Sequence, residues 1–151
     1  MQLDTSRFGP ITLDPATIIH FPLGLLGFET VQRYVLVDSD QVAPMRWLQA
    51  VDDPRLAFLV VEPGLFFPNY DVELTDADQA VLEAADGSDL AVACLVVVPE
   101  DPTSMTINLM GPLVMNSGKR LGKQVVMHDG QYSPRQRLLP DEAQSEEAAL
   151  V

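Results

Sequence analysis

The chain has 151 residues, 47% of them hydrophobic, which is enough for one domain with its own core. Its formal net charge of −13 disfavours direct contact with nucleic acid, whose phosphates need a basic surface, and suits either basic protein partners or solubility alone. No apolar run reaches the roughly 18 residues of a membrane helix and the N-terminus lacks a signal-peptide pattern, so we expect a cytoplasmic protein without membrane contact.

Short strands account for most of the sequence. The 12 prolines and 9 glycines break it into pieces that are rich in β-branched and large apolar residues. We expect strands at 11–13, 17–21, 33–37, 45–51, 56–61, 90–99, 103–109, 113–116 and 121–128. Many short strands with turn residues between them predict a mainly β fold, a small closed or partly open β-barrel or pseudobarrel of antiparallel strands.

The segments between strands have recognisable chemistry. Asp52-Asp53-Pro54 separates two apolar runs and predicts a hairpin. Asn116-Ser117-Gly118 is expected to join the last two long strands, and Asp129-Gly130 has the side chains of another hairpin turn. Segment 21–29, FPLGLLGFE, is too rich in glycine for regular structure, so we expect an apolar loop there.

One short helix is predicted between Thr75 and Gly87. Thr75 can cap its N-terminus, and Asp76 and Asp78 suit the positive first turn. Small apolar residues recur at helical spacing, at Ala77, Ala80, Val81 and Ala84. Such a face contributes little to a core, so the helix is expected to lie against the side or mouth of the barrel.

The single domain is expected to comprise residues 1–138. Residues 139–151 contain four acidic and no basic side chains, a composition that favours a disordered tail.

No combination of residues is typical of catalysis, metal binding or cofactor binding. His20 and His128 have no companion in sequence and are expected to be structural or surface residues. Cys94 lies in an apolar run, so a buried and unreactive thiol is expected. Segment 71–83 lacks the glycine and ligand pattern of a calcium loop, and 118–124 lacks the spacing of a phosphate loop. We therefore expect no enzyme activity, no metal and no cofactor.

An aromatic segment follows the run 56–61. Phe66, Phe67 and Tyr70 lie around two prolines that forbid a helix interior or a central strand. These rings either form a satellite core cluster beneath a loop or contact a partner, and the sequence leaves both interpretations open.

Three motifs, in the same order, resemble the FliW family of bacterial flagellar assembly factors. They are HFPLGLLGFE at 20–29, WLQAVDDPRLAFLVV running into FFPNY at 47–70, and VPEDP, NLMGPLVMN and GKQVV between 97 and 138. The resemblance spans about residues 11–138. Two departures are small: Leu26 stands where the family often has proline, and Gly111 stands where alanine often precedes Pro112.

The resemblance implies a small β-barrel-like protein that binds two partners in the cytoplasm. One is CsrA, an RNA-binding translational repressor, and the other is flagellin before its export. Flagellin that accumulates would occupy the protein and free CsrA to repress flagellin translation, whereas export of flagellin would let the protein capture CsrA. The acidic body fits this role, because a negative field beside CsrA would repel RNA without occupying the RNA site.

Two alternatives lie outside this interpretation. The first is a cytoplasmic chaperone or adaptor for flagellin or another secreted subunit, without antagonism of CsrA. The second is a small-molecule-binding barrel, which the apolar alternation of the strands disfavours.

Flagellin is expected to present an apolar terminal helix to the aromatic and methionine-bearing segments. The partner-binding candidates are Phe66, Phe67, Tyr70, Asn108, Met110, Met115 and Asn116. The methionines are alternatively ordinary core residues. We expect a monomer when the protein is free.

Overall fold

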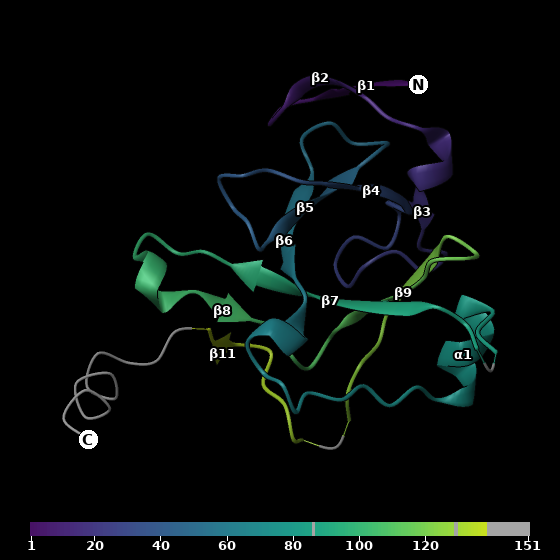
Figure 1. Ribbon diagram of the computed structural model, residues 1–151, viewed down its shortest axis with the longest axis vertical. Helices are drawn as coiled ribbons and strands as arrows, with labels where there is room; N and C mark the ends of the chain where they lie inside the picture. The colour runs from purple at the N-terminus through teal and green to yellow at the C-terminus, as the bar shows by residue number, and fades with distance from the viewer. Residues whose placement is uncertain (86, 129, 139–151) are drawn as a thin grey trace.

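A computed structural model of the chain describes residues 1–85, 87–128 and 130–138. In these residues seven strands close into a barrel (Figure 1). They are β3 (Ile19–His20), β4 (Arg33–Val37), β5 (Arg46–Ala50), β6 (Ala57–Val61), β7 (Leu90–Val97), β9 (Leu113–Asn116) and β10 (Leu121–Gln124). Neighbouring strands are antiparallel except β3 and β10, which pair in parallel at His20 and Leu121. The predicted mainly β barrel with a helix is confirmed.

The remaining elements lie around this barrel. A hairpin of β1 (Gln2–Thr5) and β2 (Gly9–Thr12) contributes Leu3 and Ile11 to a cluster with Val35 and Val51. The helix α1 (Asp76–Leu82) has 7 residues, and no helix in the described ranges is long and apolar enough to cross a membrane. Three 3₁₀ turns complete the description: η1 (Pro15–Thr17), η2 (Pro63–Leu65) and η3 (Pro102–Ser104).

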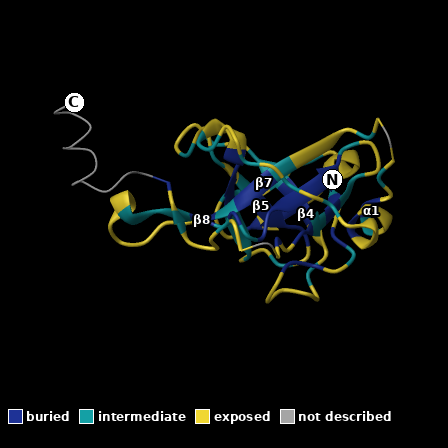
Figure 2. Cartoon of the chain, turned by 90° about the horizontal axis from the view of Figure 1, so that it is seen from below, coloured by how far each residue is buried: buried dark blue, intermediate teal, exposed yellow. Residues whose placement is uncertain are grey.

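Strand β7 is part of the barrel at its start and part of a separate ribbon at its end. Its first half, Leu90–Ala93, pairs with β9 and closes the barrel, whereas Val96 and Val97 pair with β8 (Thr106–Ile107). A short strand, β11 (Gln136–Arg137), adds to the far edge of β8. The end of β7 with β8 and β11 forms a ribbon that extends away from the barrel, as Figures 1 and 2 show. Figure 2 also shows that burial is concentrated in the barrel strands; in the ribbon Val96 and Ile107 are buried, and its other strand residues are intermediate or exposed.

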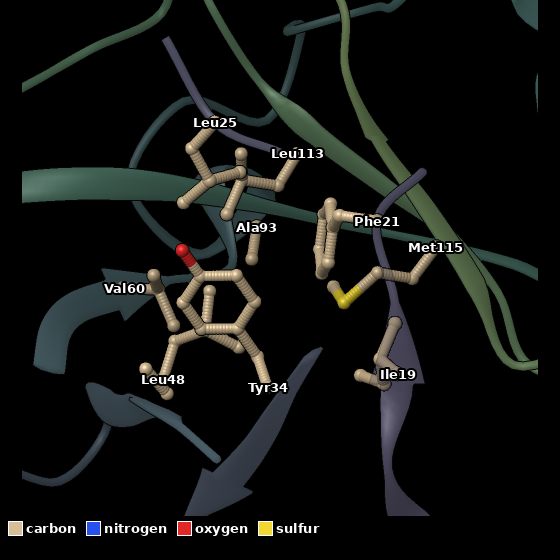
Figure 3. Packing of buried hydrophobic residues seen from close by; sticks show 10 residues of the cluster. Ile19, Phe21, Leu25, Tyr34, Leu48, Val60, Ala93, Leu113 and Met115 are labelled. Atoms are coloured by element: carbon tan, nitrogen blue, oxygen red, sulfur yellow. The ribbon is translucent and has the colours of Figure 1, made fainter. Parts of the chain in front are cut away.

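The barrel interior is filled by large side chains from most of its strands (Figure 3). Tyr34 and Phe21 are fully buried, and their rings meet edge to face with centroids 5.5 Å apart. Burial, with Asp53 nearby, raises the pKa of Tyr34 to about 12. Leu25 enters this core from the loop 21–29, which is irregular as predicted. This loop therefore contributes to the barrel core as well as connecting β3 to β4.

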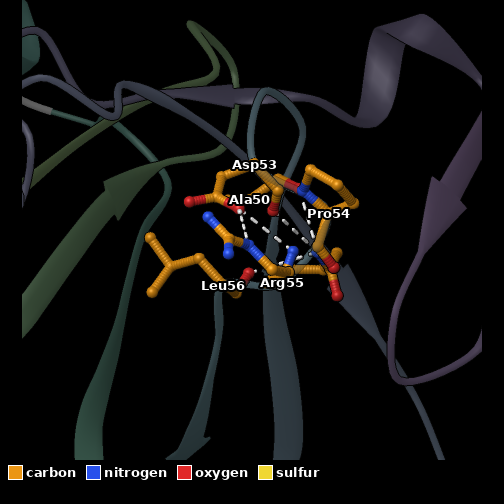
Figure 4. A network of polar contacts seen from close by, with 6 residues as sticks. Ala50, Asp53, Pro54, Arg55 and Leu56 are labelled. Atoms are coloured by element: carbon orange, nitrogen blue, oxygen red, sulfur yellow. Dashed lines mark hydrogen bonds and ion pairs between the residues drawn. The ribbon is translucent and has the colours of Figure 1, made fainter.

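The β5–β6 hairpin is confirmed at Asp52-Asp53-Pro54, and a buried glutamine holds its turn. The Nε2 of Gln49 donates to the carbonyl oxygen of Ala50 at 3.0 Å and to that of Leu56 at 3.1 Å (Figure 4). Longer bonds of 3.4 Å reach the carbonyls of Asp53 and Pro54. One side chain thus satisfies several main-chain acceptors of the turn.

Helix α1 begins where the sequence predicts and ends earlier. Thr75 and Asp78 form a reciprocal capping box. The helix ends at Leu82, with Glu83 in the left-handed conformation at φ 50°, so the expected end at Gly87 is wrong. The reason is tertiary: the Nδ2 of Asn116 on β9 donates to the carbonyl oxygen of Leu82 at 2.9 Å and satisfies the helix end there.

Other differences from the predicted elements have local causes. Expected strand 17–21 starts at Ile19, because Asp14 caps η1. Expected strand 103–109 shortens to Thr106–Ile107, because Asp101 caps η3 in the same way. Strands β1 and β11 were not predicted. Asp129 lies outside the described residues, and β10 and β11 on either side of it pair with other strands.

Candidate functional site

The residue types of catalytic and metal sites are scattered. Among the described residues no group of three His, Cys, Asp or Glu side chains could hold a metal ion. His20 and His128 are both exposed. Cys94 is buried, as predicted, and burial raises its pKa to about 12, so it stays a thiol at neutral pH.

Two concave surfaces are each lined in part by a residue of the aromatic segment. The first, which we call the main cleft, has a volume of about 880 Å³. Its apolar floor comes from β6, β7 and β9, and its lining includes charged side chains of both signs, Arg46, Arg120, Glu62 and Asp71. A cleft of this size, apolar within and polar at its margin, matches the surfaces on which proteins hold an amphipathic segment.

The second concavity, which we call the apolar groove, has a volume of about 370 Å³. It lies beside the root of the ribbon, and its walls come from segment 41–45, from Leu59 and Phe66, and from Val98, Met105 and Leu138. Of the described residues that line it, Gln41 alone has a polar side chain. Pro44 lines both concavities, which are therefore neighbours.

The three aromatic candidates are partly buried over the core cluster that contains Leu59, Cys94 and Leu109. The hydroxyl of Tyr70 donates to the carbonyl oxygen of Leu109 at 2.6 Å, and its ring meets Tyr132 edge to face at 4.6 Å. Tyr70 lines the main cleft, whereas Phe66 lines the apolar groove. The packing interpretation of these rings is thus correct, and each ring also keeps an exposed part. Their contact with a partner stays a prediction.

The four candidates from segment 108–116 lie in different surroundings. The Oδ1 of Asn108 accepts from the amides of Met110 and Gly111, at 3.1 and 2.8 Å, and shapes the turn before β9. Met115 and Asn116 are 6% and 3% exposed, and both line the floor of the main cleft. Met110 is half-buried and lines neither concavity. The structure therefore places Tyr70, Met115 and Asn116 at one cleft and the other candidates outside it.

The negative charge of the molecule is not balanced locally. Among the described residues, four of the basic side chains already pair with acids: Arg33 with Asp52, Arg46 with Asp38, Arg55 with Asp53 and Lys123 with Asp78. Arg7 stacks over the ring of Trp47 at 4.1 Å. These ion pairs involve only four of the 22 acidic side chains, so the chain keeps a strong net negative charge.

Sequence reasoning missed the residues of the apolar groove. The groove is lined by residues from segments that are far apart in the chain: Val42 and Met45, then Val98 and Met105, then Leu138. Each is an ordinary apolar residue in its own segment, so no local signal marks it. These segments come together through the successive pairing of β5, β6, β7, β8 and β11.

Comparisons with known proteins agree with this architecture. The profile of the family described as FliW protein matches residues 2–138. The chain is 35% identical over 151 residues to the flagellar assembly factor FliW of Natranaerobius thermophilus, covering 99% of this chain and 100% of that one. It is 39% identical over 142 residues to the FliW of Alkaliphilus metalliredigens, covering 93% and 88% of the two chains.

The fold is also found in a solved structure. The crystal structure of a flagellar assembly factor FliW superposes with a TM-score of 0.87 at 32% identity, over 94% of this chain and 99% of that chain. The FliW proteins are assembly factors and are not an enzyme family. The chain therefore belongs to the FliW family, and its role lies in the assembly of the flagellum.

Proposed function

We propose that this chain binds flagellin and CsrA in alternation in the cytoplasm, and so couples the translation of flagellin to its export. The observation that carries the proposal is family membership over residues 2–138, with the three motifs of the family in order. The geometry supports it in two ways: the molecule offers concave apolar surfaces that suit protein segments, and it has a strong negative charge.

The charge bears on how CsrA would be antagonised. A protein that binds RNA presents a basic surface, and an acidic body docked beside that surface would lower its positive potential. RNA would then dissociate although its site is not covered. Because exposed charges are screened over about 8 Å at physiological salt, the antagonism should weaken as salt rises.

The aromatic segment is where we place the flagellin contact. Tyr70 lines the main cleft and Phe66 lines the apolar groove, so a helix that binds in the cleft would contact Tyr70, with Phe66 and Phe67 in the same segment. Such helix-in-groove recognition uses apolar side chains at i, i+3 and i+4. Met115 and Asn116 would meet such a helix only at the bottom of the cleft, since both are buried.

The test is a titration of the protein into a CsrA–RNA complex at two salt concentrations, repeated with flagellin present. We expect RNA release that excess RNA does not overcome competitively, less release at high salt, and reversal by flagellin. Binding of flagellin without any binding of CsrA would contradict the proposal and would favour a flagellin chaperone.

A further inference from the structure

The apolar groove is a surface for which no use has been assigned. Leu59 is buried at its floor, and Val98 is 48% exposed at its margin. Two methionines, Met45 and Met105, are half-buried in its walls. Methionine side chains adapt to differently shaped apolar groups, so these walls suit a side chain inserted from another molecule.

The groove is already formed in the free chain. On one side, the amide of Met45 donates to the carbonyl oxygen of Val42 at 2.8 Å, which fixes the turn that forms this wall. On the other side, the amide of Leu138 donates to the carbonyl oxygen of Met105 at 3.1 Å and holds the ribbon against the last described residue. A ligand therefore does not have to order these walls when it binds.

The segments that form the groove are acidic. Segments 38–46, 59–66, 97–105 and 136–138 contain five acids and two bases, a net charge of −3. Asp38 is paired with Arg46, whereas Asp40 precedes the lining residue Gln41, and Glu100 follows Val98 by two residues. The segments that form the groove thus combine apolar lining residues with a net negative charge.

We propose that the apolar groove is a docking site for a short protein segment with aliphatic anchor residues flanked by lysine or arginine. The anchors would fill the space above Leu59, and the flanking cations would face Asp40 and Glu100. The proposal deepens the proposed function and rests on it only in that the chain acts by holding protein partners.

The same charge argument disfavours other occupants. Nucleic acid and a second copy of this chain would each bring further negative charge to an acidic margin. The chain's own segment 139–151 has four acids and no base, so it lacks the flanking cations.

The experiment uses the full chain and two labelled synthetic peptides. Both have a leucine and valine centre, flanked by lysines in one and by glutamates in the other. We expect the lysine peptide to bind and the glutamate peptide to bind at least about tenfold more weakly, with the difference shrinking at high salt. Equal binding of the two peptides would overturn the proposal.

Two neighbouring valines provide a matched pair of variants. Val98→Asn changes a groove residue that is 48% exposed, whereas Val97→Asn changes a neighbouring valine that is 64% exposed and does not line the groove. Both keep the charge, and melting temperatures check that both fold. Val98→Asn should weaken the lysine peptide about fivefold to tenfold and Val97→Asn less than twofold; equal losses would place the peptide elsewhere and refute the assignment.

A second pair tests the acidic margin. Glu100→Lys should weaken binding of the lysine peptide. Glu73→Lys, the same change in a segment beside the main cleft, should have the smaller effect.

If the peptide binds only after residues 139–151 are deleted, the groove is the binding site of that segment and the proposal fails. CsrA and flagellin are assayed in parallel, so a wild-type chain that binds the peptide but neither protein would contradict the proposed function alone.

Discussion

At the scale of single residues, Gly24 is the position where the loop 21–29 depends most on having no side chain. Its φ is +65°, and a Cβ there would lie 2.6 Å from both the Cα of Glu29 and the carbonyl oxygen of Phe28. Those are main-chain atoms of the same tight loop and cannot move aside cheaply. Gly27 also has a positive φ, of 87°, but a Cβ there would meet nothing within 4 Å.

This contrast predicts different costs for the same substitution. Gly27→Ala should lower the free energy of unfolding by about 1 kcal/mol, the cost of a left-handed alanine. Gly24→Ala should cost about 2–4 kcal/mol, because main-chain overlap is added to that cost and Leu25 is displaced from the core. Urea unfolding of both variants measures this, and equal losses would show that the loop relaxes around Gly24.

Phe67 is the residue at which the flagellin proposal is most directly tested. Phe67→Ala should weaken flagellin binding about tenfold or more, as truncation of an aromatic anchor does. Some stability should also be lost, since the ring packs on the cluster around Cys94. Phe8→Ala is the matched control, because Phe8 is likewise half-buried and packs edge to face on Trp47. Unchanged flagellin affinity in Phe67→Ala would remove this residue from the site.

At the scale of elements, α1 is attached to the barrel by Leu82, which is fully buried against Val114, and by polar contacts. The predicted small apolar face is wrong, since Ala77 and Ala80 are exposed. Lys123 on β10 forms an ion pair with Asp78, and the side chains of the two are 17% and 8% exposed. Burial pushes the pKa of Asp78 upward, but hydrogen bonds from Lys123 and Thr75 outweigh it, and the pKa lies below its usual value. Asp78 therefore both caps the helix and attaches it to the barrel.

The lowered pKa gives this attachment a pH dependence. The folded state holds Asp78 ionised more strongly than the unfolded state does, so the contribution to stability is complete above about pH 4 and is lost as pH falls further. Asp78→Asn should lower the free energy of unfolding by about 2 kcal/mol at pH 7 and by clearly less at pH 3. Asp76→Asn, an exposed neighbour in the same turn, should cost about 0.5 kcal/mol. A pH-independent loss in Asp78→Asn would contradict this account.

The strands also show which parts of the fold could be predicted from the sequence. β4 and β9 have the predicted bounds because each is an apolar run between clear turn residues. β11 could not be predicted, because its two residues are a strand only through pairing with β8. The candidate site divides in the same way. Proline and aromatic content marked 66–70, whereas the apolar groove depends on contacts between distant segments that carry no local pattern.

At the scale of the whole molecule, part of the negative charge can be removed without removing any core residue of the described chain. Residues 139–151 carry four of the 22 acids and no base, so deleting them changes the formal net charge from −13 to −9. Leu138, the last described residue, is buried in the cluster around Leu59 and would be retained.

Deletion of residues 139–151 should therefore leave the melting temperature within about 2 °C of the full chain, since no core side chain of the described residues is lost. The comparison is made by thermal unfolding of both chains at the same salt concentration. A fall of many degrees would show that the tail contributes to the fold.

The parallel pairing of β3 with β10 has a consequence for how the protein is made. His20 on β3 pairs with Leu121 on β10, so the pairing that closes the barrel joins its first strand to the last of its strands to be synthesised. Until then β3 lacks one neighbour, and the six earlier barrel strands do not enclose a complete interior. Such distant pairings make closure slow. We therefore expect the nascent chain to be most prone to aggregation before β10 has been synthesised.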